Sequence, residues 1–111
     1  MNLTFCSNKL KKVCDSEKQM RTTLGISMSE KLKQRLFELK SADSLEDMRK
    51  IPAANCHELG HNRQGQLAVD LHQPKRLIFK PDHNPTPTKP DGGLDWTKVT
   101  SIEVVEIVDY H

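Results

Sequence analysis

The chain ends in a run of β-forming residues that decides the fold: Val99-Thr100-Ser101-Ile102-Glu103-Val104-Val105-Glu106-Ile107-Val108-Asp109-Tyr110-His111. Apolar residues occupy both alternating sets of positions, with Ile102, Val104 and Val108 in one set and Val99, Val105 and Ile107 in the other. Because successive side chains of a strand point to opposite faces, this pattern predicts a central strand covered on both sides. The run stops on an acid, a phenol and an imidazole. These are either incidental terminal residues or reactive groups that a rigid strand carries to a site.

Length and composition predict one globular domain that spans residues 1–111. Hydrophobic residues make up 35% of the chain and charged residues 29%, which is typical of a single modest core with a wet surface. No apolar run approaches the ~20 residues of a membrane span, and the N-terminus lacks the pattern of a secretory signal. The three widely spaced cysteines (Cys6, Cys14 and Cys56) fit reduced thiols. We therefore expect a cytoplasmic protein that uses neither a membrane nor a cofactor.

Residues 7–50 have a helical period. A first helix is expected to begin with Ser7 as its N-cap and to end at Gly25. A second helix is expected after the capping box Ser27-Met28-Ser29-Glu30. Its apolar stripe consists of Met28, Leu32, Leu36 and Leu39. The basic residues of the same helix are expected on its solvated side: Lys31, Lys33, Arg35 and Lys40.

Beyond Pro52 the apolar period changes from about 3.6 residues to 2. Residues 81–95 are rich in Pro and Gly and form a loop longer than compact domains usually hold, with Trp96 expected to pin its far end. Strands are expected at 56–59, 66–71 and 76–80, with turns at 62–65 and 72–74 between them. The elements together predict an α+β fold in which an N-terminal helical hairpin, about residues 7–50, packs on a small, mainly antiparallel sheet, about residues 55–111.

One motif points to a different chemistry. His57-Glu58-Leu59-Gly60-His61 matches HExxH, which on a helix places two histidines on one face to bind zinc and supplies a glutamate as general base. Pro52 precedes the motif, Gly60 lies inside it, and no amphipathic helical stripe surrounds it. A zinc peptidase is therefore a remote alternative, and we expect no metal site here.

Six short blocks then follow one another in a recognisable order. They are Cys-His-Glu-Leu (56–59), Asn-Arg-Gln-Gly-Gln (62–66), Val-Asp-Leu (69–71), Arg-Leu-Ile-Phe (76–79), Asp-Gly-Gly-Leu-Asp-Trp (91–96) and Glu-Ile-Val-Asp-Tyr-His (106–111). These blocks resemble the HigB-type killer toxins of the RelE/ParE superfamily, which belong to bacterial type II toxin–antitoxin systems. The resemblance covers nearly the whole chain and is more specific than HExxH alone.

The resemblance implies a RelE/ParE-like fold and a ribosome-dependent endoribonuclease that cuts mRNA in the ribosomal A site. It also implies a helix-turn-helix antitoxin of the HigA type as the partner. Operator DNA would be bound only through the complex of toxin and antitoxin. The ribosome and mRNA are the other implied partners.

Site residues follow from the resemblance position by position. Arg76 matches the catalytic arginine, and His57 matches a histidine at the start of the active-site hairpin. Asp109, Tyr110 and His111 match the functional C-terminal residues. Where many relatives have a lysine, this chain has Gly60 followed by His61, so His61 or Arg63 would have to supply that RNA-binding cation.

The residue types fit this chemistry without the resemblance. Cutting RNA without a metal needs a base for the 2′-OH, cations or donors for the charged phosphorane, and an acid for the leaving oxygen. Histidines titrate near neutral pH, and arginines fork onto phosphate oxygens. In a regular strand Asp109 and His111 share a face and Tyr110 takes the other. Two alternatives keep the same fold without RNA chemistry: a gyrase-targeting toxin and a weakened toxin that serves mainly as an antitoxin partner.

Overall fold

The computed structural model describes residues 1–109, and Tyr110 and His111 lie outside the described residues. The chain forms β1 (Asn2–Phe5), three α-helices and then four further strands separated by short 3-10 turns. The helices are α1 (Asn8–Asp15), α2 (Glu17–Leu24) and α3 (Ile26–Ser41), and the later strands are β2 (His57–Glu58), β3 (Leu67–Asp70), β4 (Lys75–Pro81) and β5 (Ser101–Asp109). The predicted α+β class is confirmed, with the helices preceding most of the sheet.

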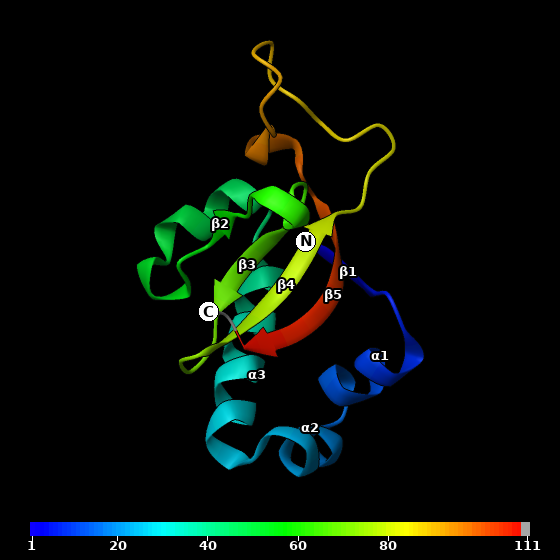
Figure 1. Ribbon diagram of the computed structural model, residues 1–111, viewed down its shortest axis with the longest axis vertical. Helices are drawn as coiled ribbons and strands as arrows, with labels where there is room; N and C mark the ends of the chain where they lie inside the picture. Colours follow the sequence, from blue (N-terminus) through cyan, green and yellow to red (C-terminus); the bar gives the residue numbers. More distant parts are fainter. Residues whose placement is uncertain (110–111) are drawn as a thin grey trace.

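The five strands make one mixed sheet in the order β1-β5-β4-β3-β2. The first strand returns beside the last in parallel, whereas β2, β3, β4 and β5 pair with one another in antiparallel fashion. The expected internal position of the terminal strand is therefore confirmed. Figure 1 shows α3 crossing behind β3 and β4, while β2 continues the sheet at its edge, beside β3. One face of the sheet is thus covered by α3; the other, called the open face below, faces away from α3 and still buries Ala68 and Ile78 completely.

A β-bulge in β5 changes which residues share a face. Ile78 pairs with Glu106 but the next residue, Phe79, pairs with Val104, so Val105 is an additional residue without a partner in the ladder. An additional residue shifts the two-residue alternation by one position. Ile107 consequently packs against the same core as Ile102 and Val104, and Val108 moves to the opposite side of the sheet. The predicted grouping of Val108 with Ile102 is wrong for this reason, whereas the apolar residues of β5 are buried or half-buried on both faces.

The helical region consists of three helices where two were predicted. Ser16 ends α1, where its backbone N–H donates to the carbonyl of Lys12, and it also begins α2 by accepting from Gln19 N–H through its side chain. Serine readily bonds its own backbone in this way, which interrupts a helix. The predicted capping box is also wrong, because α3 starts at Ile26 after Gly25 and Ser29 donates its hydroxyl proton to the carbonyl of Ile26.

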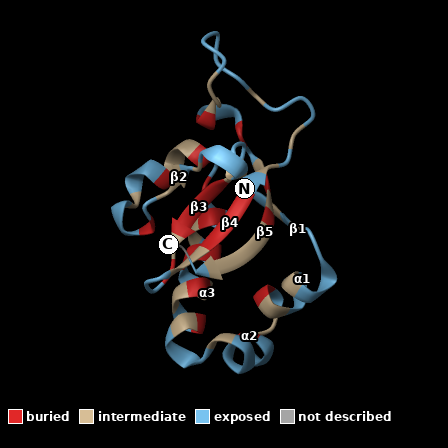
Figure 2. Cartoon of the chain, viewed as in Figure 1, coloured by how far each residue is buried: buried red, intermediate tan, exposed pale blue. Residues whose placement is uncertain are grey.

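The hydrophobic core lies between α3 and the covered face of the sheet. Three residues of the predicted stripe are buried there, and Met28 packs at the edge. Figure 2 shows the buried residues gathered in β3, β4 and the adjoining part of α3. The core positions on the two sides of this interface are Leu32, Leu36 and Leu39 from the helix, and Leu67, Val69, Leu77 and Phe79 from the strands. One basic residue of α3, Arg35, is buried with them at 2% exposure, so its expected solvated position is wrong.

The loop over residues 81–95 extends away from the body of the protein and is mostly exposed (Figure 2). At its start His83 Nε2 accepts hydrogen bonds from the backbone N–H groups of Thr100 and Ser101, at 3.1 and 3.2 Å. At its end Trp96 is 5% exposed, which confirms that this residue pins the far end of the loop. Trp96 opens the 3-10 turn η4 (Trp96–Lys98) and lies under the guanidinium of Arg49, 3.9 Å from the ring centre. Among residues 1–109, no helix is long and apolar enough to cross a membrane.

Candidate functional site on the open sheet face

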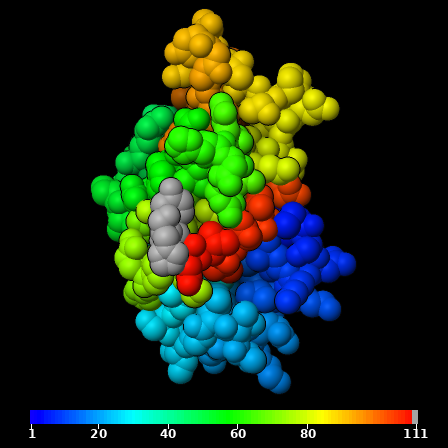
Figure 3. Space-filling view, viewed as in Figure 1, coloured from blue at the N-terminus to red at the C-terminus, as the bar shows by residue number. Residues whose placement is uncertain are grey.

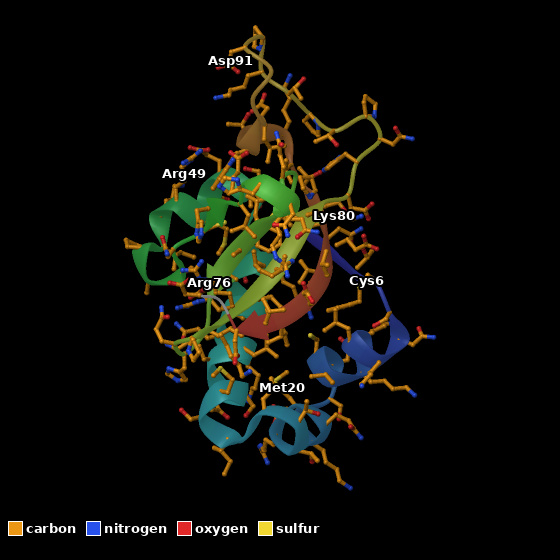
Figure 4. The ribbon with its side chains drawn as sticks, viewed as in Figure 1. Cys6, Met20, Arg49, Arg76, Lys80 and Asp91 are labelled. Atoms are coloured by element: carbon orange, nitrogen blue, oxygen red, sulfur yellow. The ribbon has the colours of Figure 1, made fainter. Side chains whose placement is uncertain are left out.

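Strand register brings several of the predicted site residues to the open face. His57 pairs with Ala68, which pairs with Ile78, and Ile78 pairs with Glu106. Two residues before Ile78 on β4, Arg76 pairs with Asp70 on β3 and with Val108 on β5. Residues at even spacing share a face of a sheet, so these two rows of side chains lie side by side on the face opposite α3. Figure 4 labels Arg76 at the beginning of β4, close to the end of β5.

An ion pair holds Arg76 in place on this face. Its Nε lies 3.1 Å from Asp70 Oδ1, and both side chains are 17% exposed. The other carboxylate oxygen of Asp70 accepts a hydrogen bond from the side-chain amide of Asn55, at 3.2 Å. Asp70 therefore fixes the guanidinium on the open face, where 17% of the Arg76 side chain is exposed. A guanidinium fixed in this manner is suited to binding a phosphate.

The imidazole of His57 is oriented by the same asparagine. His57 Nδ1 lies 2.6 Å from the backbone carbonyl of Asn55. Because a carbonyl can only accept, Nδ1 carries a proton in this arrangement, and because the neighbouring Arg76 nitrogen can only donate, a hydrogen bond with it requires a lone pair on Nε2. That Nε2 atom lies 3.5 Å from Arg76 Nη1. Asn55 reaches both neighbours from a left-handed backbone conformation (φ 48°), which asparagine adopts more readily than most residues.

A second arginine reaches across the open face from the turn η3 (His61–Arg63). Arg63 Nη2 donates to the carboxylate of Glu106 on β5, and Nη1 donates to the side chain of Gln66 at 3.0 Å. Figure 3 shows the segment around residue 60, in green, at the surface of the face in view. His61 is exposed at the start of this turn. Arg63 therefore reaches the row of side chains that contains His57, and His61 lies two residues before it in the same turn.

The end of β5 lies next to Arg76, but Asp109, the last described residue, belongs to the opposite face of the sheet. Val108 pairs with Arg76 and Asp109 pairs with Lys75, and the carboxylate of Asp109 lies 2.7 Å from Lys75 Nζ. By strand alternation, Asp109 and Lys75 lie toward the helical side of the sheet. The predicted roles of Tyr110 and His111 fall on residues outside the described part of the chain, so they stay predictions.

The HExxH segment is not helical. His57 and Glu58 form β2, and His61 begins η3 after an extended Gly60, so the two histidines do not share a helix face. Glu58 instead accepts a hydrogen bond from the indole N–H of Trp96 at 3.1 Å. Within residues 1–109, no group of three or more His, Cys, Asp or Glu side chains is arranged to hold a metal ion. The geometry that the zinc-peptidase alternative requires is therefore missing.

Cys56 immediately precedes the site but is not poised as a nucleophile. Burial raises the pKa of its thiol from the ordinary 9.0 to about 12. Only the thiolate is a good nucleophile, so this side chain is protonated and inert at neutral pH.

Asp70 and Asn55 belong to the site but were not among the predicted residues. A signal for Asp70 was available: the turn at 72–74 places it opposite Arg76 in a hairpin, and opposite charges at facing positions stabilise a strand pair. Asn55 carried no comparable signal, because its role depends on the left-handed turn between η2 (Pro52–Ala54) and β2.

Comparison with solved structures places this fold among bacterial toxins. The whole chain matches a YoeB/ParE toxin from Agrobacterium tumefaciens over all of that chain, with a TM-score of 0.55 at 10% identity. It also matches a YoeB-YefM complex from Staphylococcus aureus (TM-score 0.56, 16% identity) and a YoeB dimer from the same organism (TM-score 0.51, 14% identity), each over 97% of that chain and all of this one. Comparisons with protein-family models and with curated proteins give no match.

These matches show that the chain has the fold of the YoeB/ParE-type toxins. Identities of 10–16% show the fold alone. The HigB subtype predicted from the sequence blocks stays a prediction.

Proposed function

We propose that this protein is the toxin of a type II toxin–antitoxin system and acts as a ribosome-dependent mRNA endoribonuclease that needs no metal. The observation that carries the proposal is the contact between His57 Nε2 and Arg76 Nη1, at 3.5 Å, on the open face of the sheet. It puts a base and a phosphate-binding cation within the space of one phosphodiester group. The toxin fold of the structural neighbours supports the same assignment.

The proposed reaction is an internal transfer within the RNA backbone. His57 Nε2 removes the proton from a ribose 2′-OH, and the 2′ oxygen attacks the adjacent phosphorus. The bond from phosphorus to the 5′ oxygen then breaks, which leaves a 2′,3′-cyclic phosphate and a 5′-hydroxyl end. Arg76, held by Asp70, stabilises the negative charge that develops on the phosphorane oxygens.

The remaining predicted residues have roles in the same proposal. His111 or Tyr110 donates the proton that the leaving 5′ oxygen takes up, and Asp109 with its partner Lys75 anchors the end of β5 that carries them. His61 and Arg63 bind the RNA backbone or a neighbouring base from η3. Arg63 has to exchange its bond to Glu106 for a phosphate when RNA binds.

The partners in this proposal are an antitoxin, the ribosome and mRNA. One structural neighbour is a YoeB-YefM complex, which supports an antitoxin as the protein partner. We propose a helix-turn-helix antitoxin of the HigA type, with operator DNA bound only through the complex. The site of action is the cytoplasm.

The decisive experiment is to induce the chain briefly in bacterial cells and to map the 5′ ends of mRNA. Cuts inside translated regions, in register with codons and absent when translation is blocked, support the proposal. The variants His57→Gln and Arg76→Ala should remove these cuts, whereas Lys18→Ala should keep them because Lys18 is exposed on α2, outside the site. An unchanged 5′-end pattern together with DNA damage would instead favour the gyrase-targeting alternative, and growth without either effect would favour the weakened toxin.

A further inference from the structure

Arg35 is a charged residue inside the core with every part of its head group engaged. Its side chain is 3% exposed. Its Nε donates to the backbone carbonyl of Asp70 at 2.7 Å, and its Nη2 donates to the backbone carbonyl of Ala53 at 2.9 Å. Its Nη1 donates to both carboxylate oxygens of Glu38, at 3.0 and 3.3 Å. A buried charge needs hydrogen-bond partners, but that need alone does not explain why the partners are the carbonyls of Asp70 and Ala53.

The two carbonyls belong to the segments that carry the open-face site. Asp70 is the last residue of β3, and its carboxylate holds Arg76. Ala53 lies in η2, two residues before Asn55, whose carbonyl orients His57. One guanidinium on α3 therefore fixes, from behind the sheet, the relative position of the segments that present the base and the cation.

The geometry of the guanidinium suits this task better than any other side chain. Its five N–H donors form a rigid planar fork, so Nε and Nη2 can bind two carbonyls of different segments while Nη1 faces a carboxylate. A lysine has one ammonium group and cannot hold the same three directions together. The bond between Asn55 and Asp70, 3.2 Å long, closes the arrangement on the other side of the sheet.

We propose that Arg35 is a positioning residue of the site, which acts through Asp70 and through the turn at Asn55 to set the tautomer of His57 and its place beside Arg76. The effect on His57 stands on the contacts themselves. The consequence for RNA cleavage rests on the proposed function.

The test uses the full-length protein labelled with ¹⁵N and long-range ¹H–¹⁵N spectra of its histidines, with His57 assigned by the variant His57→Gln. In the unaltered protein the shifts should report a proton on Nδ1 and a bare Nε2. The double variant Arg35→Met with Glu38→Gln removes the guanidinium without leaving a buried carboxylate behind. We expect it to show mixed tautomers of His57 and, in a translating extract, about 100-fold slower mRNA cleavage, since a displacement of about 1 Å at a site can cost that much.

Leu32→Ala is the matched control, because Leu32 is fully buried in the same helix and contacts the core rather than the site. It should lower stability but keep the Nδ1–H tautomer and the cleavage rate. Arg35→Lys, which keeps the charge beside Glu38, should give an intermediate tautomer population and serves as the test if the double variant does not fold.

Two results would overturn the positioning role: a folded double variant with the Nδ1–H tautomer intact, or an Arg35→Lys protein whose His57 spectrum and cleavage match those of Leu32→Ala. Absence of cleavage in the unaltered protein would count against the proposed function only. The tautomer measurement would still decide whether Arg35 positions His57.

Discussion

Arg35 and Arg76 reach Asp70 from opposite faces of the sheet. Arg35 binds the backbone carbonyl of Asp70 at 2.7 Å from the covered face, and Arg76 binds its carboxylate at 3.1 Å from the open face. The side chain of Arg35 is 3% exposed and that of Arg76 is 17% exposed. The same type of side chain thus meets the same residue in two different surroundings.

The difference distinguishes an arginine that holds the fold together from an arginine that is placed to take part in a reaction. The donors of Arg35 are directed at carbonyls and a carboxylate that the fold holds in place, so this guanidinium offers nothing to a ligand. Arg76 points one terminal nitrogen toward His57, which is itself an ionisable group, on a face that no helix covers. A few polar groups that converge on a surface are typical of binding sites, whereas a fully engaged buried ion pair is typical of structure.

The largest expected effect is the loss of stability on removing Arg35, on the covered face. Arg35→Met leaves Glu38, whose side chain is 14% exposed, without its cation inside the protein. Removing one partner of a buried pair costs about 3–5 kcal/mol of the free energy of unfolding. Arg76→Met should cost less, because the side chain of Arg76 is 17% exposed against 3% for Arg35, and Arg35 also binds two backbone carbonyls in the core. Urea unfolding of the two variants measures both losses, and equal losses would remove the distinction between the two arginines.

The next effect concerns the open side. Arg76→Lys keeps a positive charge but loses the planar fork, so mRNA cleavage should fall about 100- to 1,000-fold, the usual cost of losing a donor that stabilises a developing oxyanion. Asp70→Asn, which keeps the size of the partner and removes its charge, should cause a smaller fall. Lys80→Met is the matched control, since Lys80 lies on the same strand and face but pairs with Glu103. Cleavage that survives in Arg76→Lys while dropping in Lys80→Met would place the site elsewhere on the face.

The covered side of the molecule was largely predictable from periodicity. The stripe on α3, the alternation in β3 and the internal position of β5 all follow from burial of apolar side chains at regular intervals. Trp96 was predictable because a large aromatic residue at the end of a polar loop has few favourable positions other than the core.

The features that differ from the prediction have physical causes that a periodic pattern of apolar residues does not show. The bulge at Val105 lies where the alternation of apolar and acidic residues slips by one position, at Val104-Val105, and it reverses the faces of everything after it, so a strict two-residue period assigns those faces wrongly. Arg35 is one of several basic residues on its helix, and its burial depends on carbonyls that lie far away along the chain. Asn55 owes its role to a backbone conformation. Site residues whose roles are set by long-range contacts are the ones that the sequence left unidentified.

The buried thiols of Cys14 and Cys56 predict that the free energy of unfolding falls at alkaline pH. Burial raises the pKa of Cys14 and of Cys56 from 9.0 to about 12 in the folded protein. The folded state then holds these protons more tightly than the unfolded chain, so their contribution is complete below pH 9 and is lost as pH rises from 9 toward 12. One pH unit above 9 the loss should be roughly 1.4 kcal/mol per thiol. Urea unfolding at pH 8 and pH 10 measures it; Cys14→Ala should reduce the difference, and Cys6→Ser, at an exposed position, should not.

The smallest expected effect concerns Arg63. Its role is either that of Arg76, binding phosphate, or that of Arg35, holding the fold. Its side chain is 31% exposed and its partner Glu106 is 41% exposed, so Glu106→Gln should change the free energy of unfolding by less than about 1 kcal/mol. If Arg63 belongs with Arg76, the same substitution should release it for phosphate and tighten binding of a short single-stranded RNA a few-fold, with a steeper dependence on salt. Fluorescence anisotropy at two salt concentrations measures this, with Arg63→Gln expected to act in the opposite direction. If Glu106→Gln leaves RNA binding unchanged or weakens it, Arg63 is instead a strap that holds η3 on the sheet, and its role resembles that of Arg35.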